Sequence, residues 1–332
     1  MIYIDNQGVT DPHLNLAIEE YVLRFLDTDE DCLLLYINEP SIIIGRNQNV
    51  HEEINHEFVE QHEIPVIRRI SGGGAVYHDP GNLNFSFITD YEMTKLNNYK
   101  IFNGPVIQVL KKLDINAYLD ERNAMMVGKY KISGNAQFSS SGRMVSHGTL
   151  LFDSNLNYVE HALKPGIRNI SSRAHKSVRS TVKNISEFLQ KPMTILEFKN
   201  FLLKGLQQVM EPIEHYKLTE NDWGKIRELK TKYTQWDWNY GRSPKFTLNR
   251  KKEFDFGSLE IDLEVHKGRI TDAKLLSNSV NGPLLYQIEQ QLIGTKYDPE
   301  SLANTLKKLP IHDNGMDLEL NILLKLLYGP DH

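Results

Sequence analysis

Apolar residues in this chain repeat with two different periods, and segments of the two kinds alternate along most of its length. Short apolar runs, the pattern typical of strands, occupy residues 1–4, 33–37, 42–44, 64–67 and 83–88. Helical spacing separates them. Behind Asp11 and Pro12, which suit an N-cap and a first helical turn, comes an apolar stripe formed by Leu14, Ala17, Ile18, Tyr21, Val22 and Phe25. We interpret this first helix as scaffold.

The runs 33–37 and 42–44 flank the turn-forming residues 38–41, so we expect them to pair as two strands around that turn. Thr194 and Glu197 form a capping box, which predicts a helix that begins there. The helical pattern predicts elements at about 52–62, 101–113, 194–209 and 220–233.

Residues 129–137 alternate between polar and apolar side chains, which predicts one half-buried strand with Lys129, Lys131 and Ser133 on the same face. A second strand is predicted at 147–153, and the serine-rich segment 139–142 is typical of a turn. We therefore expect Lys131 and His147 to be neighbours across a hairpin.

The aromatic stretch 236–244 interrupts the regular patterns, and we place a domain boundary at its end. The predicted domains span 1–244 and 245–332. In the second, strands are expected at 254–265 and 269–276, with helices at 284–293, 301–309 and 316–327. The fold class is α+β, with a large mixed-sheet domain flanked by helices and a small α+β C-terminal domain.

Composition restricts the function. The chain has 332 residues, of which 40% are hydrophobic, enough for a substantial core. A net charge of −5 and a pI near 6.2 argue against a general nucleic-acid binder. We expect no membrane span and no leader peptide, and therefore a cytoplasmic location. The single cysteine excludes an internal disulfide, and its place at the start of an apolar run indicates that Cys32 is a buried, unreactive thiol.

The most distinctive stretch is Arg68-Arg69-Ile70-Ser71-Gly72-Gly73-Gly74, which continues as Ala75-Val76-Tyr77-His78-Asp79. Three glycines after a strand allow close backbone approach, and two arginines beside them supply charge, so the stretch suits an anion. It matches neither the P-loop nor the dinucleotide-binding motif. A flexible surface turn is the other interpretation that these residues leave open.

Taken with two later segments, this stretch resembles one family. The later segments are Lys131-Ile132-Ser133-Gly134 with Ala136, and His147-Gly148-Thr149-Leu150-Leu151. Further matches are 15–20, Gly81-Asn82, Lys176 to Ser180 and 236–244. With these motifs in this order, the chain resembles the lipoate-protein ligases, in the superfamily shared with biotin protein ligases and octanoyl transferases. The resemblance covers essentially the whole chain and implies the mixed-sheet fold of that superfamily.

The resemblance implies carboxylate activation followed by amide formation. Lipoate would attack the α-phosphate of ATP to give lipoyl-AMP and pyrophosphate, with Mg²⁺ shielding the phosphates, and the acyl group would then pass to a lysine. Lys131 and Arg69 are the expected catalytic residues, Lys131 as an electrostatic anchor. The expected binding residues are Arg69, Gly72, Gly73, Gly74, Ala75, Val76, Tyr77, Lys131 and His147. We expect no protein metal site.

The expected acceptors are lipoyl domains of 2-oxoacid dehydrogenase E2 subunits and the glycine-cleavage H protein. Three alternatives stay open: a biotin-type ligase, an octanoyl or lipoyl transferase, and a non-enzymatic sensor of a nucleotide or acyl-adenylate. His147 would orient the intermediate or fix its strand. Arg46 would face the ligand or cap the sheet, and the basic segment 165–183, with Arg168 and Arg179, would close over phosphate or remain a solvated loop.

One position departs from the family pattern. Ala124 follows Arg122 and Asn123, where relatives usually carry an aspartate. An aspartate near an adenylate can hold Mg²⁺ or accept a hydrogen bond, whereas alanine can do neither. We expect the pocket to bind ligand but to adenylate more slowly than is usual in the family.

Overall fold

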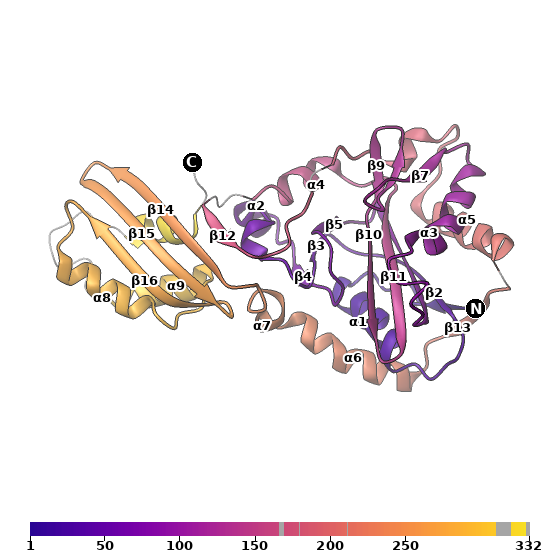
Figure 1. Cartoon of the computed structure of the whole chain (residues 1–332), viewed down its shortest axis with the longest axis horizontal. Helices are drawn as coiled ribbons and strands as arrows, with labels where there is room; N and C mark the ends of the chain where they lie inside the picture. Colours follow the sequence, from indigo (N-terminus) through magenta and orange to yellow (C-terminus); the bar gives the residue numbers. More distant parts are fainter. Residues whose placement is uncertain (166–168, 179, 211, 310–319, 330–332) are drawn as a thin grey trace. The chain divides into compact units, whose positions relative to one another are not determined.

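The computed structural model describes residues 1–165, 169–178, 180–210, 212–309 and 320–329 (Figure 1). The chain divides into two compact units, each assembled from several stretches. Unit 1 comprises Met1–Arg46, Ile64–His161 and Ser177–Gln235; unit 2 comprises Asn47–Glu63, Ala162–Lys176 and Trp236–His332. The domain boundary after residue 244 stays a prediction. No helix within the described ranges is long and apolar enough to span a membrane.

A six-stranded mixed sheet organises unit 1, in the order β10-β11-β6-β2-β1-β13. Neighbours from β10 to β2 are antiparallel, whereas β1 runs parallel to both β2 and β13. Its strands are β1 (Ile2–Asp5), β2 (Cys32–Ile37), β6 (Asn82–Asp90), β10 (Asn135–Ser140), β11 (Arg143–Leu151) and β13 (Glu214–Lys217). The predicted mixed sheet is confirmed.

Alternation along β6 shows how the two faces of this sheet differ. Leu83, Phe85 and Phe87 join a hydrophobic core that also contains residues of α3 (Tyr99–Lys111) and α5 (Ile195–Val209). Ser86 points to the opposite face, where α1 (Pro12–Arg24) lies beside α6 (Glu220–Thr234). The sheet is therefore covered on both faces, and α1 covers the face that carries Ser86.

The expected pairing of 33–37 with 42–44 is wrong. The first run is β2, which is already paired on one edge with β1 and on the other with β6, so it has no free edge for a third strand. The second run, β3 (Ser41–Ile44), instead lies between β4 (Val66–Arg68) and β5 (Val76–His78) in a small separate sheet. These two strands bracket the glycine-rich stretch.

The segment 129–137 is not one strand either. Gly134 divides it into β9 (Tyr130–Ser133) and β10, and β9 pairs in a third sheet with β8 (Met125–Val127), next to β7 (Ala117–Leu119). The hairpin of β10 and β11 turns at Ser141 and Gly142, both with positive φ (57° and 78°). This register sets His147 opposite Ala136. Lys131 lies on β9, outside this hairpin, so the expectation that Lys131 and His147 are neighbours across a hairpin is wrong.

In unit 2, a four-stranded sheet of order β12-β14-β15-β16 packs against helices. Its strands are β12 (Ile170–Ser172), β14 (Phe246–Phe254), β15 (Gly257–His266) and β16 (Arg269–Ser277). The described helices that share its core are α8 (Gly282–Leu292), α9 (Pro299–Leu306) and α10 (Leu320–Tyr328). The sequence predicted β15, β16 and these helices but missed β14; residues 316–319 of the last predicted helix lie outside the described residues.

Shorter elements complete both units. Unit 2 contains η1 (Val50–Glu52), α2 (His56–Gln61) and α7 (Trp236–Asn239), and η2 (Ile185–Phe188) belongs to unit 1. The helix α4 (Leu156–Ala162) begins in unit 1.

Two histidines of unit 2 form a buried aromatic cluster, which we call the His51–His56 cluster. His51 Nδ1 lies 3.0 Å from His56 Nε2, and the Tyr328 hydroxyl lies 3.0 Å from His56 Nδ1. The rings of Tyr297 and Phe246 lie 4.9 and 5.4 Å from that of His51. Burial lowers the pKa of His56 to about 3, so this ring is neutral at physiological pH.

Candidate active site

The glycine-rich stretch forms a tight loop between β4 and β5 of unit 1. Its ends are tied to β3 and the residues after it, since Arg69 N–H donates to the Ile44 carbonyl (2.9 Å) and Arg46 N–H to that of Ser71 (2.8 Å). Gly73 has φ +89°, and a Cβ there would lie 2.9 Å from Arg69 Nη2. A Cβ on Gly45 would lie 2.0 Å from the Gly73 oxygen. The loop conformation therefore requires glycine at both positions.

The guanidinium of Arg69 lies inside this loop and holds it. Its Nη2 donates to the carbonyls of Gly72 (2.5 Å) and Gly74 (2.9 Å), and its Nη1 to that of Ile43 (3.0 Å). Burial lowers the pKa of Arg69 to about 10, opposed by Glu19, so the side chain stays cationic at neutral pH. Arg68 is fully buried and donates to the carbonyls of Gly45 and Arg46. Direct contact between Arg69 and a phosphate stays a prediction.

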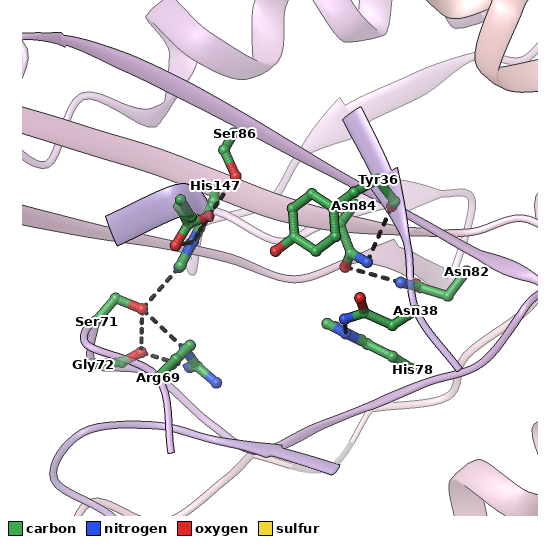
Figure 2. Close-up of polar contacts among 11 residues, drawn as sticks. Tyr36, Asn38, Arg69, Ser71, Gly72, His78, Asn82, Asn84, Ser86 and His147 are labelled. Carbon is green, nitrogen blue, oxygen red and sulfur yellow. Dashed lines mark hydrogen bonds and ion pairs between the residues drawn. The ribbon is translucent and has the colours of Figure 1, made fainter. Parts of the chain in front are cut away.

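His147 lies directly behind the loop, on the sheet face that α1 covers. The register of β11 and β6 sets it opposite Ser86. Its Nε2 lies 2.7 Å from Ser71 Oγ, which also accepts from Arg69 Nε at 2.9 Å, as Figure 2 shows. Its Nδ1 lies 2.8 Å from a carboxylate oxygen of Glu19, a residue that the sequence analysis placed in scaffold. The site therefore contains two residues that were not predicted, Glu19 and Ser71.

Lys131 supplies a second cationic group, on β9. Burial lowers the pKa of its ammonium, and the nearby charge of Asp120 opposes that shift. A Cβ on Gly134 would lie 3.4 Å from Lys131 Nζ, so this glycine leaves room beside the ammonium. The following strand, β10, brings Ala136 to the loop: a Cβ built on Gly73 would lie 3.5 Å from the Cβ of Ala136. Lys131 thus lies near Gly134, and the glycine loop lies near Ala136, two positions further along the chain.

The end of the glycine loop contacts Ser177, the first serine of the Lys176–Ser180 motif. Ala75 N–H donates to Ser177 Oγ at 2.9 Å, and a Cβ on Gly74 would lie at the same distance from that oxygen. Val76 and Tyr77 belong to β5, and the Tyr77 side chain is buried. Arg168 and Arg179, the basic residues expected to meet phosphate, lie outside the described residues.

His78 ends β5 inside the same site. Its Nδ1 lies 2.9 Å from Asn38 Nδ2, and its Nε2 is buried without a hydrogen-bond partner among the described residues (Figure 2). Burial, together with the charges of Arg69 and His147, lowers the pKa of His78 to about 3. A neutral imidazole therefore faces the cationic groups of the site, so it adds no further positive charge.

Two other sequence predictions concern residues outside this network. Cys32 is fully buried in β2, as predicted, and burial raises the pKa of its thiol. Arg46 is exposed and lies over the ring of Phe138, 5.3 Å from its centroid. Within the described ranges, no three His, Cys, Asp or Glu side chains form a group that could hold a metal ion.

The chain matches two protein families in succession. Residues 11–207 match the lipoyl protein ligase A/B catalytic domain, and residues 243–327 match the bacterial lipoate protein ligase C-terminus. A curated relative, lipoate-protein ligase LplJ of Bacillus subtilis, is 47% identical over 99% of this chain and 100% of its own length.

Solved structures agree with these matches. The structure of P. falciparum LipL1 in complex with lipoate superposes with a TM-score of 0.61 at 26% identity, covering 98% of this chain and 99% of that one. A lipoate-protein ligase A bound with ATP gives a TM-score of 0.60 at 28% identity, covering 70% and 95%. The chain therefore belongs to the lipoate-protein ligase family, and with it to the ligase class of enzymes.

Proposed function

We propose that this enzyme activates free lipoate with ATP to form lipoyl-AMP and pyrophosphate, and then transfers the lipoyl group to a lysine of an acceptor protein. The observations that carry this proposal are the glycine loop held by the Arg69 guanidinium and the half-buried Lys131 ammonium on β9. Of two relatives with the same fold, P. falciparum LipL1 was solved in complex with lipoate and a lipoate-protein ligase A was solved with ATP bound.

The charges of the site suit the first step. The carboxylate of lipoate and the α-phosphate repel each other, and a cation between them reduces that repulsion. In this proposal Lys131 bridges the two anions without forming a covalent bond. The glycine loop, with Ala75, Val76 and Tyr77 beyond it, lines the nucleotide, and Mg²⁺ is held mainly by phosphate oxygens and water.

The second step moves the acyl group from AMP to the ε-amine of a lysine, and AMP leaves. We propose lipoyl domains of 2-oxoacid dehydrogenase E2 subunits and the glycine-cleavage H protein as acceptors, and the cytoplasm as the place of reaction. A thioester route of the octanoyl transferase kind has little support from Cys32, because this thiol is fully buried and its pKa is raised.

The test is the pair Lys131→Ala and Lys129→Ala. Lys129 is an exposed lysine two positions away, which makes it a matched control. We expect Lys131→Ala to lower lipoate-dependent pyrophosphate release more than about 100-fold, because a charge-assisted contact in the transition state is lost. Lys129→Ala should behave as wild type, and circular dichroism should show both variants folded. A wild-type rate in Lys131→Ala would contradict the assignment.

Intact-mass analysis of acceptor domains, with ATP, Mg²⁺ and free lipoate, tests the second step. A mass increase of one lipoyl group on a lysine supports ligase activity. Incorporation of labelled biotin in place of lipoate would identify a biotin-type ligase. The absence of any lipoate-dependent turnover would favour a non-enzymatic sensor.

A further inference from the structure

Four buried polar side chains from three segments of unit 1 form a continuous series of contacts that ends at the glycine loop. Glu19 of α1 contacts His147 Nδ1 at 2.8 Å; His147 Nε2 contacts Ser71 Oγ at 2.7 Å; and Arg69 Nε contacts that oxygen at 2.9 Å. The exposed fractions are 1% for Glu19, 9% for His147, 0% for Ser71 and 5% for Arg69, so solvent has almost no access to these side chains. We call this series of contacts the Glu19–Arg69 chain.

Glu19 is the anion of this chain. Burial by itself would raise the pKa of its carboxyl group, but the charge and hydrogen bond of His147 and the hydrogen bond of Ser86 outweigh burial and lower it. Ser86 Oγ donates to Glu19 Oε2 at 2.5 Å. The carboxylate also raises the pKa of Arg69 against the effect of burial. A buried guanidinium needs such a counter-charge, since removing a buried charge's partner is strongly destabilising.

One proton position in the Glu19–Arg69 chain follows from its acceptor. A carboxylate only accepts, so Nδ1 of His147 carries the proton that faces Glu19. Ser71 Oγ accepts from Arg69 Nε, lies 2.7 Å from His147 Nε2 and contacts the Gly72 carbonyl at 3.4 Å. The hydroxyl therefore joins the guanidinium to the imidazole, and the carboxylate determines the orientation of the imidazole.

The far end of the chain is the loop itself. The Nη atoms of Arg69 donate to the carbonyls of Ile43, Gly72 and Gly74, which fixes the direction in which the intervening peptide groups point. A backbone loop binds an anion only if its N–H groups converge. A displacement of the Arg69 guanidinium would therefore displace the N–H groups of the loop.

We propose that Glu19 is a positioning residue for adenylation: through His147 and Ser71 it fixes the guanidinium of Arg69 and thereby the conformation of the Gly72–Gly74 loop. This inference deepens the proposed function at the same site and rests on it for every activity measurement. The conformation of the loop, however, can be measured without any substrate.

Glu20 offers a matched control, because it is the next residue of α1 and nearly as buried (4% exposed). Its carboxylate accepts from the Tyr233 hydroxyl at 2.7 Å and pairs with Lys232 and Arg24, away from His147. Glu19→Gln removes the charge and keeps the shape. We expect its kcat for lipoate-dependent pyrophosphate release to fall about 10- to 100-fold, the scale of a small misplacement of binding groups. Glu20→Gln should keep the wild-type kcat.

A purely structural role for Glu19 would not move two further readouts in the ligand-free protein. Hydrogen exchange of the amides of residues 72–75 should accelerate in Glu19→Gln and not in Glu20→Gln. The ¹⁵N shifts of His147 should show a protonated Nδ1 in the wild type and a larger population with an unprotonated Nδ1 in Glu19→Ala. Ser71→Ala, which interrupts the chain at its centre, should accelerate the same amides, and the double variant Glu19→Gln/Ser71→Ala should be no worse than Ser71→Ala alone.

Unchanged loop exchange, together with additive effects in the double variant, would overturn the proposal. So would equal losses of kcat in Glu19→Gln and Glu20→Gln, since that result would reflect general destabilisation. If the wild-type protein itself released no pyrophosphate, the proposed function would fail, while the exchange and tautomer measurements would still decide whether Glu19 controls the loop.

Discussion

Two histidines of similar burial, one in each unit, have very different surroundings. His147 of unit 1 is 9% exposed and faces a carboxylate at 2.8 Å, and its other nitrogen contacts a residue of the glycine loop. His56 of unit 2 is 6% exposed and lies between His51 and the hydroxyl of Tyr328. The first histidine is part of a charged network that ends at the proposed nucleotide site, whereas the second is a neutral ring within a core. Burial alone therefore says little about function; the charge of the partner separates the two cases.

The strongest test of this contrast is Arg69→Ala. The substitution removes the group that holds the loop carbonyls and the cation that Glu19 balances. We expect adenylation to weaken by about 1.5 to 3 kcal/mol or more, the usual scale for charge-assisted contacts. Pyrophosphate release and nucleotide affinity are the measurements. If both were unchanged, the charged network would have no role in the reaction.

His56→Ala should have the opposite profile. It removes the hydrogen-bond partner of the Tyr328 hydroxyl and of His51 Nδ1. We expect the free energy of unfolding to fall by about 1 to 3 kcal/mol, because these polar groups are buried. Urea unfolding followed by tryptophan fluorescence reports it, since Trp236 and Trp238 lie in unit 2. The folded protein should keep its kcat; a loss of kcat with unchanged stability would remove the distinction between the two histidines.

Acid should destabilise the wild type partly through His56. Its folded pKa of about 3 lies below the usual 6.5, so the unfolded chain binds the proton more readily. The contribution of His56 to stability is fully present above pH 6.5 and is lost as the pH falls from there towards 3, by about 1.4 kcal/mol per pH unit. His56→Gln should therefore show a shallower slope of unfolding free energy against pH between 4 and 6. An identical slope would show that this histidine does not titrate on unfolding.

Ala124→Asp is expected to have the smallest effect. Ala124 N–H donates to Asp120 Oδ1 at 2.8 Å, and the charge of Asp120 acts on Lys131, so a new carboxylate would enter the charged region of the site. We expect the rate of pyrophosphate release to rise a few-fold, equivalent to about 1 kcal/mol or less, in a magnesium-dependent way. Titration of Mg²⁺ in both forms measures it. Superimposable curves would mean that this position does not influence catalysis.

The sequence predicted most elements of the fold, and the family resemblance is confirmed, but the buried polar partners were missed. The first helix was interpreted from its apolar stripe alone. Asn15 and Glu19 are four residues apart, on the side that also carries Ile18 and Val22, and both are buried. Polar residues at helical spacing among apolar ones were the available signal.

Two strand errors also have physical causes. Gly134 divides a regular alternation, and glycine within a strand pattern often marks such a break. In β14 the inward positions are Phe246, Leu248 and Arg250, and the arginine hides the alternation. Its guanidinium donates to the carbonyls of Leu326 (2.9 Å) and Gly329 (2.6 Å), which only the folded chain brings near. Long-range partners of this kind cannot be read from local pattern.

Unit 2 is assembled from three separate stretches of the chain, which limits where the protein can be truncated. A truncated protein that ended at residue 244 would retain Ile170–Ser172 but lose β14, the strand that pairs with it. It would also retain His51 and His56 without Tyr297 and Tyr328, the rings that enclose them. An unpaired strand edge and an uncovered aromatic surface favour aggregation. A shortened version for expression should therefore redesign residues 47–63 and 162–176 together with the new terminus.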